Sequence, residues 1–164
     1  MMKIGVISDT HFPDPASGVA FMDSLCETVF ADVEYILHAG DIEHPDLLFC
    51  FDRKPLLAVR GNCDEAHPEL PEKRILELRG VRIGLIHGWG AGNGIVKNVL
   101  SRFTDEDLDV LVFGHSHYPL YRQNGDIVLF NPGSATERRN APFHSVGILE
   151  LNDSVTGTIV NIDS

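Results

Sequence analysis

The sequence predicts a mixed α/β domain in which two packed β-sheets are flanked by helices. Strand-like and helix-like segments alternate over the first third, whereas the last third consists of strand pairs. The 164 residues suffice for one substantial hydrophobic core. No long charge block, repeat or low-complexity linker interrupts the chain, so we expect one domain spanning residues 1–164.

The first third has the pattern of a parallel sheet with helical crossovers. The expected elements, in chain order, are a strand at 3–8, a helix at 17–30, a strand at 35–38, a helix at 45–53 and a strand at 56–60. Ser17 is the expected cap of the first helix, and Pro45 suits the first turn of the second.

The rest of the chain combines hairpins with one more crossover. We expect a hairpin over 73–88 that turns at Arg79-Gly80, a helix at 95–103 and a buried strand at 109–114. A second hairpin turns at Asn124-Gly125, and two alternating strands follow, parted by a turn near Asp153. The chain is therefore expected to end as an antiparallel meander.

Composition and charge exclude several classes of protein. The formal net charge of −11 disfavours non-specific binding to nucleic acid or to an anionic membrane. No apolar run approaches the roughly 20 residues of a membrane span. The first residues enter a strand-like segment without the layout of a signal peptide, so we expect a cytoplasmic protein.

The three cysteines do not suggest a covalent framework. Cys26, Cys50 and Cys63 are odd in number, widely spaced and lack a C-x-x-C pattern, which disfavours both a disulfide scaffold and a zinc knuckle. Cys26 and Cys50 lie in apolar segments and are expected in the core.

Five strand-like runs are each followed by one or two residues that can bind a metal ion. These residues, in chain order, are Asp9, His11, Asp41, Asn62, His87, His115 and His117. Because the carboxyl ends of strands line the ligand crevice of open α/β sheets, all five ends can converge on one place. Each fragment alone is weak, since Gly-Asp and Gly-Asn at strand ends are usually turn residues.

The remaining histidines are assigned to ordinary structural roles. His38 is expected to pack in the core or behind the site, whereas His44, His67 and His144 are expected in loops or on the surface.

The donor set favours a metal centre. Two carboxylates, four imidazoles and one amide suit borderline divalent ions such as Mn, Fe, Zn or Ni. Seven donors exceed one tetrahedral site, but they fit two ions if one carboxylate bridges them. Two ions about 4 Å apart can hold a phosphoryl group during in-line displacement.

The order D-x-H, G-D, G-N, H-G and G-H-x-H resembles that of the calcineurin-like metallophosphoesterases. RGNCD at 60–64 and NPGS at 131–134 are similar to the compact bacterial and archaeal phosphodiesterase branch. The resemblance spans residues 3 to about 151. It implies a four-layer αββα sandwich, two divalent ions with Mn favoured over Ni, Fe or Zn, and attack on phosphorus by a hydroxide that bridges them.

The resemblance also implies the role of each donor. One ion would be held by Asp9, His11, Asp41 and His117. The other would be held by Asp41, Asn62, His87 and His115, so that Asp41 bridges the pair. Asp41, Asn62 and His87 are the expected catalytic residues, and the amide nitrogen of Asn62 can also orient substrate.

Two positions depart from the wider family. Cys63 stands where many members have a histidine that assists the leaving group, which disfavours hydrolysis of alkyl phosphates. For the cysteine itself, the role of a small filler residue in a tight loop is favoured. Asp64 is expected to hold a nearby histidine. Trp89 stands where relatives have another histidine, and it can stack on substrate or cover the site.

The glycines at 88, 90, 92 and 94 predict a mobile loop that leads from Trp89 into a helix. The helix N-terminus near Asn93 can receive an anion, or the glycines form only a loose connection. Arg138 and Arg139 can contact phosphate oxygens or remain an ordinary solvated pair.

The predicted function is hydrolysis of a small phosphodiester or nucleotide-like substrate. A phosphomonoesterase or nucleotidase of the same fold is the alternative among enzymes. A non-catalytic protein-binding scaffold, similar to a eukaryotic retromer subunit in which the metal ligands are eroded, is the alternative outside them. The expected partner is a small phosphoester, and a homo-oligomer remains open.

Overall fold

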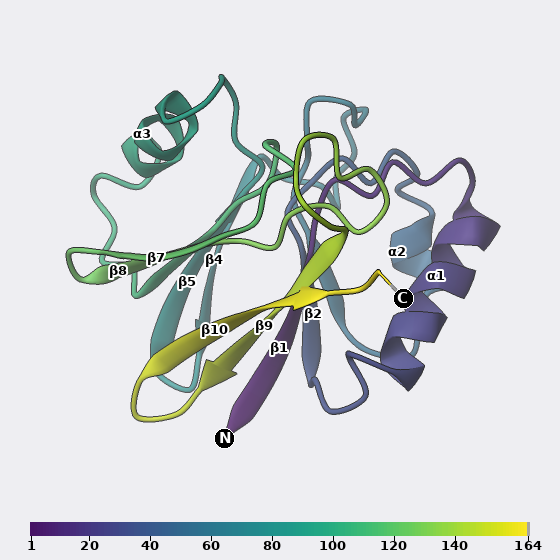
Figure 1. The fold of residues 1–164 in the computed structure, drawn as a ribbon, viewed down its shortest axis with the longest axis horizontal. Coiled ribbons are helices and arrows are strands. Elements are labelled where there is room, and N and C mark those ends of the chain that lie inside the picture. The colour runs from purple at the N-terminus through teal and green to yellow at the C-terminus, as the bar shows by residue number, and fades with distance from the viewer. Residues whose placement is uncertain (164) are drawn as a thin grey trace.

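The computed structural model describes residues 1–163 and consists of two five-stranded mixed sheets with helices on their outer faces (Figure 1). The strand order is β10-β9-β1-β2-β3 in the first sheet and β4-β5-β6-β8-β7 in the second. This arrangement confirms the predicted pair of packed sheets flanked by helices.

The first sheet contains the parallel strands of the amino-terminal third. Its strands are β1 (Met2–Ile7), β2 (Tyr35–His38), β3 (Leu56–Ala58), β9 (Ser145–Leu151) and β10 (Val155–Asn161). β1 pairs with β2 in parallel and with β9 antiparallel. Two helices, α1 (Pro15–Glu27) and α2 (Leu47–Cys50), pack on its outer face, as Figure 1 shows.

The second sheet contains the two predicted hairpins around one crossover. Its strands are β4 (Lys73–Leu78), β5 (Val81–Ile86), β6 (Val110–Val112), β7 (Leu120–Asn124) and β8 (Ile127–Asn131). The helix α3 (Gly94–Ser101) connects β5 to β6, which are parallel, and covers the outer face.

The expected carboxyl-terminal meander is wrong, because the two late hairpins belong to different sheets. β7 and β8 join β6 in the second sheet, whereas β9 and β10 join β1 in the first. The turns themselves are local and were predicted, but the sheet that a hairpin joins depends on packing between distant segments. In the β7–β8 hairpin, the turn residues are Gly125 and Asp126, one position later than expected.

Two helix details also differ from the prediction. Asp14, not Ser17, caps α1: its carboxylate accepts hydrogen bonds from the Ser17 backbone N–H and hydroxyl, both at 2.8 Å. The second helix is only one turn long, and it leaves Cys50 exposed rather than in the core. Cys26 is buried as expected.

The core lies in three apolar layers that fix the carboxyl ends of the central strands. The layer between the sheets includes Ile4, Val6, Leu85 and Phe130, all fully buried. The helices cover a further layer on each outer face. β1, β5 and β6 are thus buried on both faces, which explains their continuous apolar runs.

Phe130 offers a test of the packing between the sheets. Its ring lies against two glycines, and a Cβ added at Gly147 or Gly157 would come within 2.3 or 2.7 Å of it. Phe130→Ala is expected to lower the free energy of unfolding by about 3–5 kcal/mol, because the emptied space cannot fully close. Chemical denaturation measures this loss. Phe49→Ala, at a side chain that is 65% exposed, is the control and should change it by less than about 0.5 kcal/mol.

Candidate metal centre

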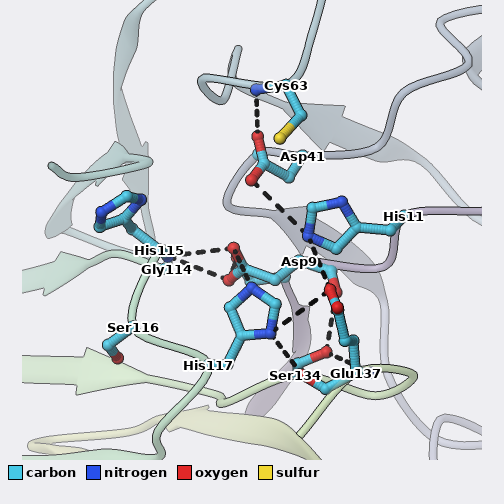
Figure 2. A network of polar contacts seen from close by, with 12 residues as sticks. Asp9, His11, Asp41, Cys63, Gly114, His115, Ser116, His117, Ser134 and Glu137 are labelled. Carbon is cyan, nitrogen blue, oxygen red and sulfur yellow. Dashed lines mark hydrogen bonds and ion pairs between the residues drawn. The ribbon is translucent and has the colours of Figure 1, made fainter. Parts of the chain in front are cut away.

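All seven predicted donors meet at the carboxyl ends of β1, β2, β3, β5 and β6. Ligand atoms of Asp9, His11 and His117 lie within 4.8 Å of one another, as do those of Asp9, Asp41 and His87. The Asn62 Oδ1 atom lies 3.0 Å from both His87 Nε2 and His115 Nδ1. Loops from both sheets therefore build one cluster, and Figure 2 shows part of it.

Asp9 is fully buried and held from several sides. The Ser8 hydroxyl and the His115 backbone N–H donate hydrogen bonds to its carboxylate at 2.7 and 3.0 Å. Burial raises the pKa of this carboxyl above its ordinary value despite the nearby histidines. Gly114 leaves room for this arrangement, since a Cβ there would lie 2.0 Å from the Ser8 hydroxyl.

Asp41 lies between two of the histidines. Its Oδ2 atom is 3.3 Å from His87 Nε2 and 3.7 Å from His11 Nε2. Its Oδ1 atom accepts a hydrogen bond from the Cys63 backbone N–H at 2.8 Å (Figure 2). Burial opposes ionisation, but His87 and the Cys63 N–H outweigh it and hold the pKa of Asp41 below its ordinary range. Asp41 therefore presents an ionised oxygen to both sides of the cluster.

Protein acceptors fix the tautomers of the four histidines, and His11 and His87 show the arrangement first. His11 donates its Nδ1 proton to the Glu43 carboxylate at 2.6 Å, and His87 donates its Nδ1 proton to the Ala39 carbonyl at 2.7 Å. Because both partners can only accept, the Nε2 atom of each neutral ring carries the lone pair. Those Nε2 atoms are the ones that face Asp41.

The other two histidines follow the same rule. His117 donates its Nδ1 proton to the Glu137 carbonyl, and its Nε2 atom lies 3.5 Å from an Asp9 oxygen. His115 is reversed: Nε2 donates to the Gly90 carbonyl at 3.1 Å, and Nδ1 faces the cluster. Histidines that bind metals typically have their other ring nitrogen fixed in this way.

Two of these lone pairs have no protein partner. Within residues 1–163, the buried Nε2 atoms of His11 and His117 make no hydrogen bond. A buried polar atom without a partner is costly, and a cation supplies the missing interaction. The two rings stack with centroids 5.3 Å apart and turn their free nitrogens toward the carboxylates. The donor set therefore fits divalent metal.

Backbone strain concentrates on the same residues. Five of the seven donors have φ in the left-handed region, namely Asp9 (52°), His11 (44°), Asp41 (57°), His115 (72°) and His117 (58°). Asp and His tolerate this conformation better than most residues, but it still has a cost. The surrounding hydrogen bonds, such as Asp9 N–H to the Gly40 carbonyl at 3.0 Å, hold the loops in place.

Asp64 does not hold a histidine, contrary to the prediction. Its carboxylate instead accepts backbone N–H bonds from Asp41 at 2.9 Å, Glu43 at 2.6 Å and Gly61 at 2.7 Å. This single side chain joins the loop after β2 to the loop after β3. It therefore positions Asp41 and Asn62 relative to each other.

Cys63 and Trp89 both lie at the centre. The Cys63 sulfur is within 4.8 Å of ligand atoms of His11 and Asp41, and burial raises the pKa of its thiol to about 11. Trp89 is 40% exposed and forms part of a pocket beside Asn62 and His87. The expected mobile glycine loop is anchored at two carbonyls, Trp89 O by the Asn98 amide and Gly90 O by His115.

The two arginines that follow the NPGS motif, Arg138 and Arg139, take no part in the described contacts of the centre. Arg138 donates to the Ala141 carbonyl at 2.8 Å, within its own loop, and Arg139 is exposed. Among residues 1–163, no hydrogen bond or ion pair brings either guanidinium to the predicted donors.

His38 has the role predicted for it behind the site. It is fully buried, which lowers its pKa to about 3 and keeps the ring neutral. Its Nδ1 atom accepts from the Gly40 N–H, so Nε2 donates to the Thr10 hydroxyl at 2.9 Å. His44, His67 and His144 are half-buried in loops or at loop ends, as expected.

Sequence reasoning missed several residues that support the centre. Glu43 binds His11, the Glu137 carbonyl binds His117, and the Ser134 hydroxyl donates to the Asp9 carbonyl at 2.7 Å. The Glu137 carboxylate also lies 3.5 Å from His11 Nε2 (Figure 2). The only signal for Glu43 was its place two residues after a strand-end aspartate. Ser134 ends the NPGS motif, but nothing in the sequence indicated that it or Glu137 contacts the centre.

The fold and the centre define a metal-binding α/β sandwich whose donors come from loops of both sheets. The calcineurin-like phosphoesterase superfamily domain matches residues 2–154, and the chain belongs to this superfamily. Among residues 1–163, none of the helices is both long and apolar enough to cross a membrane.

Three comparisons illustrate the similarity. A probable metallophosphoesterase of Methanothermobacter thermautotrophicus is 43% identical over 84% of this chain and 80% of its own. The phosphodiesterase YfcE of Escherichia coli is 34% identical over 66% of this chain and 59% of its own. The structure of Vps29 from Entamoeba histolytica complexed with zinc is 27% identical, with a TM-score of 0.66, covering 99% of this chain and 100% of that chain.

Asp64 provides a test of how the two loops are joined. Asp64→Asn exchanges one acceptor oxygen for an amide donor, which cannot accept all three N–H bonds. We expect the affinity for Mn²⁺ to fall by about 10- to 100-fold, as measured by isothermal titration calorimetry. Glu65→Gln, at the exposed neighbour, should leave the affinity unchanged. A loss smaller than about twofold for Asp64→Asn, with an unchanged melting curve, would refute this role.

Proposed function

We propose that the chain is a phosphodiesterase that uses two divalent metal ions to hydrolyse a small phosphodiester. The observation that carries this proposal is the set of four histidines, each with one ring nitrogen bound to a protein acceptor. The second nitrogen of each ring faces the shared cluster of Asp9, Asp41 and Asn62. Such an arrangement is typical of histidines that ligate metal.

The proposed ligand sets follow from which atoms face one another. One ion would be held by Asp9, His11, Asp41 and His117, and the other by Asp41, Asn62, His87 and His115. The position of Asp41 Oδ2, 3.7 Å from His11 and 3.3 Å from His87, supports its role as the shared ligand. Mixed nitrogen and oxygen donors favour Mn, with Ni, Fe or Zn as alternatives.

Bound divalent ions would acidify water and withdraw charge from phosphoryl oxygens. The protein would position the ions and hydrogen-bond the substrate. The His87 ring is held by the Ala39 carbonyl, and the Asp9 carboxylate is buried. Both donors therefore keep their positions while the substrate reacts. Asn62 is exposed at the mouth of the centre, where its amide nitrogen can donate a hydrogen bond to a phosphoryl oxygen. Asp41, Asn62 and His87 are thus the proposed catalytic residues.

Cys63 favours esters with good leaving groups, and the choice of a diester rests on the similarity to phosphodiesterases. A thiol is a weaker proton donor near neutral pH than an imidazolium. Alkoxide leaving groups need a proton in the transition state, whereas better leaving groups do not. The phosphodiesterase name of the relative YfcE is consistent with this choice.

The scaffold alternative is weaker on chemical grounds. The likeness to Vps29 keeps it open, because that fold is similar over nearly the whole chain. A surface that only binds proteins gains nothing from buried, unpartnered imidazole nitrogens at strained backbone positions. A phosphomonoesterase or nucleotidase is the remaining enzymatic alternative.

A panel of phosphate esters tests the substrate class. The protein is stripped with a chelator and reloaded with Mn, Ni, Fe or Zn, one metal at a time. Hydrolysis of aryl diesters, followed by nitrophenolate release, should exceed hydrolysis of the matching monoester. Activity confined to monoesters would select the nucleotidase alternative, and inactivity with every metal would select the scaffold.

Asp41→Asn tests the shared ligand. The amide keeps the shape but loses the charge, so we expect diester hydrolysis to fall by at least about 10²-fold and bound metal to decrease. Metal content by elemental analysis and a melting curve accompany the kinetics. Asp46→Asn, an exposed aspartate without a side-chain cap bond, is the matched control and should behave as wild type. Normal hydrolysis by Asp41→Asn would contradict the bridging role.

A further inference from the structure

A pocket with a cavity volume of about 180 Å³ opens directly beside the metal centre. It is lined by the predicted donors Asn62 and His87 on one side and by residues outside the centre on the other. The latter include Arg60, Glu72, Trp89 and Arg102. A substrate held at the centre therefore has one neighbouring space that the proposed chemistry does not use.

The charge of this pocket is positive. The Glu72 carboxylate is shared by two guanidinium groups, with Oε1 at 3.0 Å from Arg60 and Oε2 at 3.2 Å from Arg102. Two positive groups and one negative group leave one net positive charge. Each guanidinium has five N–H donors, and only some of them face Glu72. The other N–H groups can therefore donate hydrogen bonds to a bound anion. The pocket is thus locally positive in a chain whose formal net charge is −11.

The opposite rim of the centre is negative. Glu43 and Glu137 both lie against His11, at 2.6 and 3.5 Å from its ring nitrogens. No arginine or lysine of residues 1–163 forms a salt bridge with either carboxylate. The centre thus separates a basic side, at Asn62 and His87, from an acidic side at His11. A substrate with unequal charges on its two ester groups would be oriented by this difference.

Arg102, on the basic side, contacts a segment that is hydrogen-bonded to the centre. The Arg102 guanidinium lies 5.9 Å from the centroid of the Trp89 ring. The Trp89 carbonyl accepts from the Asn98 amide, and the next carbonyl, Gly90, accepts from His115. These contacts connect Arg102 to the proposed ligand His115 through the Trp89–Gly90 segment.

We infer that Arg60 and Arg102 bind a second phosphate group of the substrate, carried by the ester substituent that lies on the Asn62–His87 side. This inference rests on the proposed function and narrows its substrate class to phosphodiesters with an additional phosphate, as in nucleotides. Glu72 opposes this binding, because its carboxylate pairs with both guanidiniums.

Two nitrophenyl esters that differ by one phosphate test the inference. Thymidine 5′-(p-nitrophenyl phosphate) and its 3′-phosphorylated form have the same leaving group, so their kcat/KM ratio isolates the second phosphate. We expect the wild type to favour the 3′-phosphorylated ester by about tenfold or more, the range of charge-assisted hydrogen bonds. The double variant Arg60→Gln/Arg102→Gln should bring the ratio to about one.

Glu72→Gln gives the opposite expected sign, which misfolding cannot produce. Without the carboxylate both guanidiniums are free, so the preference for the 3′-phosphorylated ester should rise by severalfold. Arg53→Gln removes an equally exposed arginine that pairs with Glu27 on α1, and it should keep the wild-type ratio. A ratio of about one in the wild type, or no change in the arginine variant, would overturn the inference while leaving the proposed function intact.

Binding gives a readout that does not depend on turnover. Isothermal titration calorimetry of the Mn²⁺-loaded protein compares thymidine 3′,5′-bisphosphate with thymidine 5′-monophosphate. The bisphosphate should bind about tenfold more tightly, and raising the salt concentration should reduce the difference. Equal affinities would refute the inference even if both esters are hydrolysed. If neither ester is hydrolysed, the proposed function fails, and the calorimetry alone decides whether the phosphate site exists.

Discussion

The structure depends on two carboxylates kept inside an apolar sandwich. Asp9 and Asp41 lie almost without solvent contact at the ends of central strands, where an isolated charge would be strongly unfavourable. Hydrogen bonds from Ser8, His115 and Cys63 offset part of this cost. The histidine lone pairs face the same oxygens, and a divalent cation between them would satisfy both kinds of group at once. Backbone strain, glycine placement and loop connections all serve this pair.

Much of this could be predicted from the sequence, for a physical reason. Parallel strands buried on both faces have continuous apolar runs, and the polar residues that follow each run must lie at the same edge of the sheet. Asp9, Asp41, His87 and His117 were therefore identifiable without any coordinates. The local hairpin turns at Gly80 and Gly125 were visible for a similar reason, because turn chemistry is set by adjacent residues.

What could not be predicted depends on contacts between segments distant in sequence. Nothing near Asp64 reveals that its carboxylate collects three N–H groups from two loops. Nothing in the late hairpins reveals which sheet each one joins. Cys50 was misplaced because its helix ends after one turn, and apolar neighbours do not show which face of so short a segment is covered. The pairing of Arg60 with Arg102 through Glu72 is equally invisible along the chain.

The donors are divided between the two sheets: Asp9, His11, Asp41 and Asn62 follow strands of the first, and His87, His115 and His117 follow strands of the second. A cation bound by these residues would cross-link the two sheets at one end of the sandwich. Part of its binding energy then resists separation of the layers. Depriving cells of metal would thus shorten the lifetime of the protein.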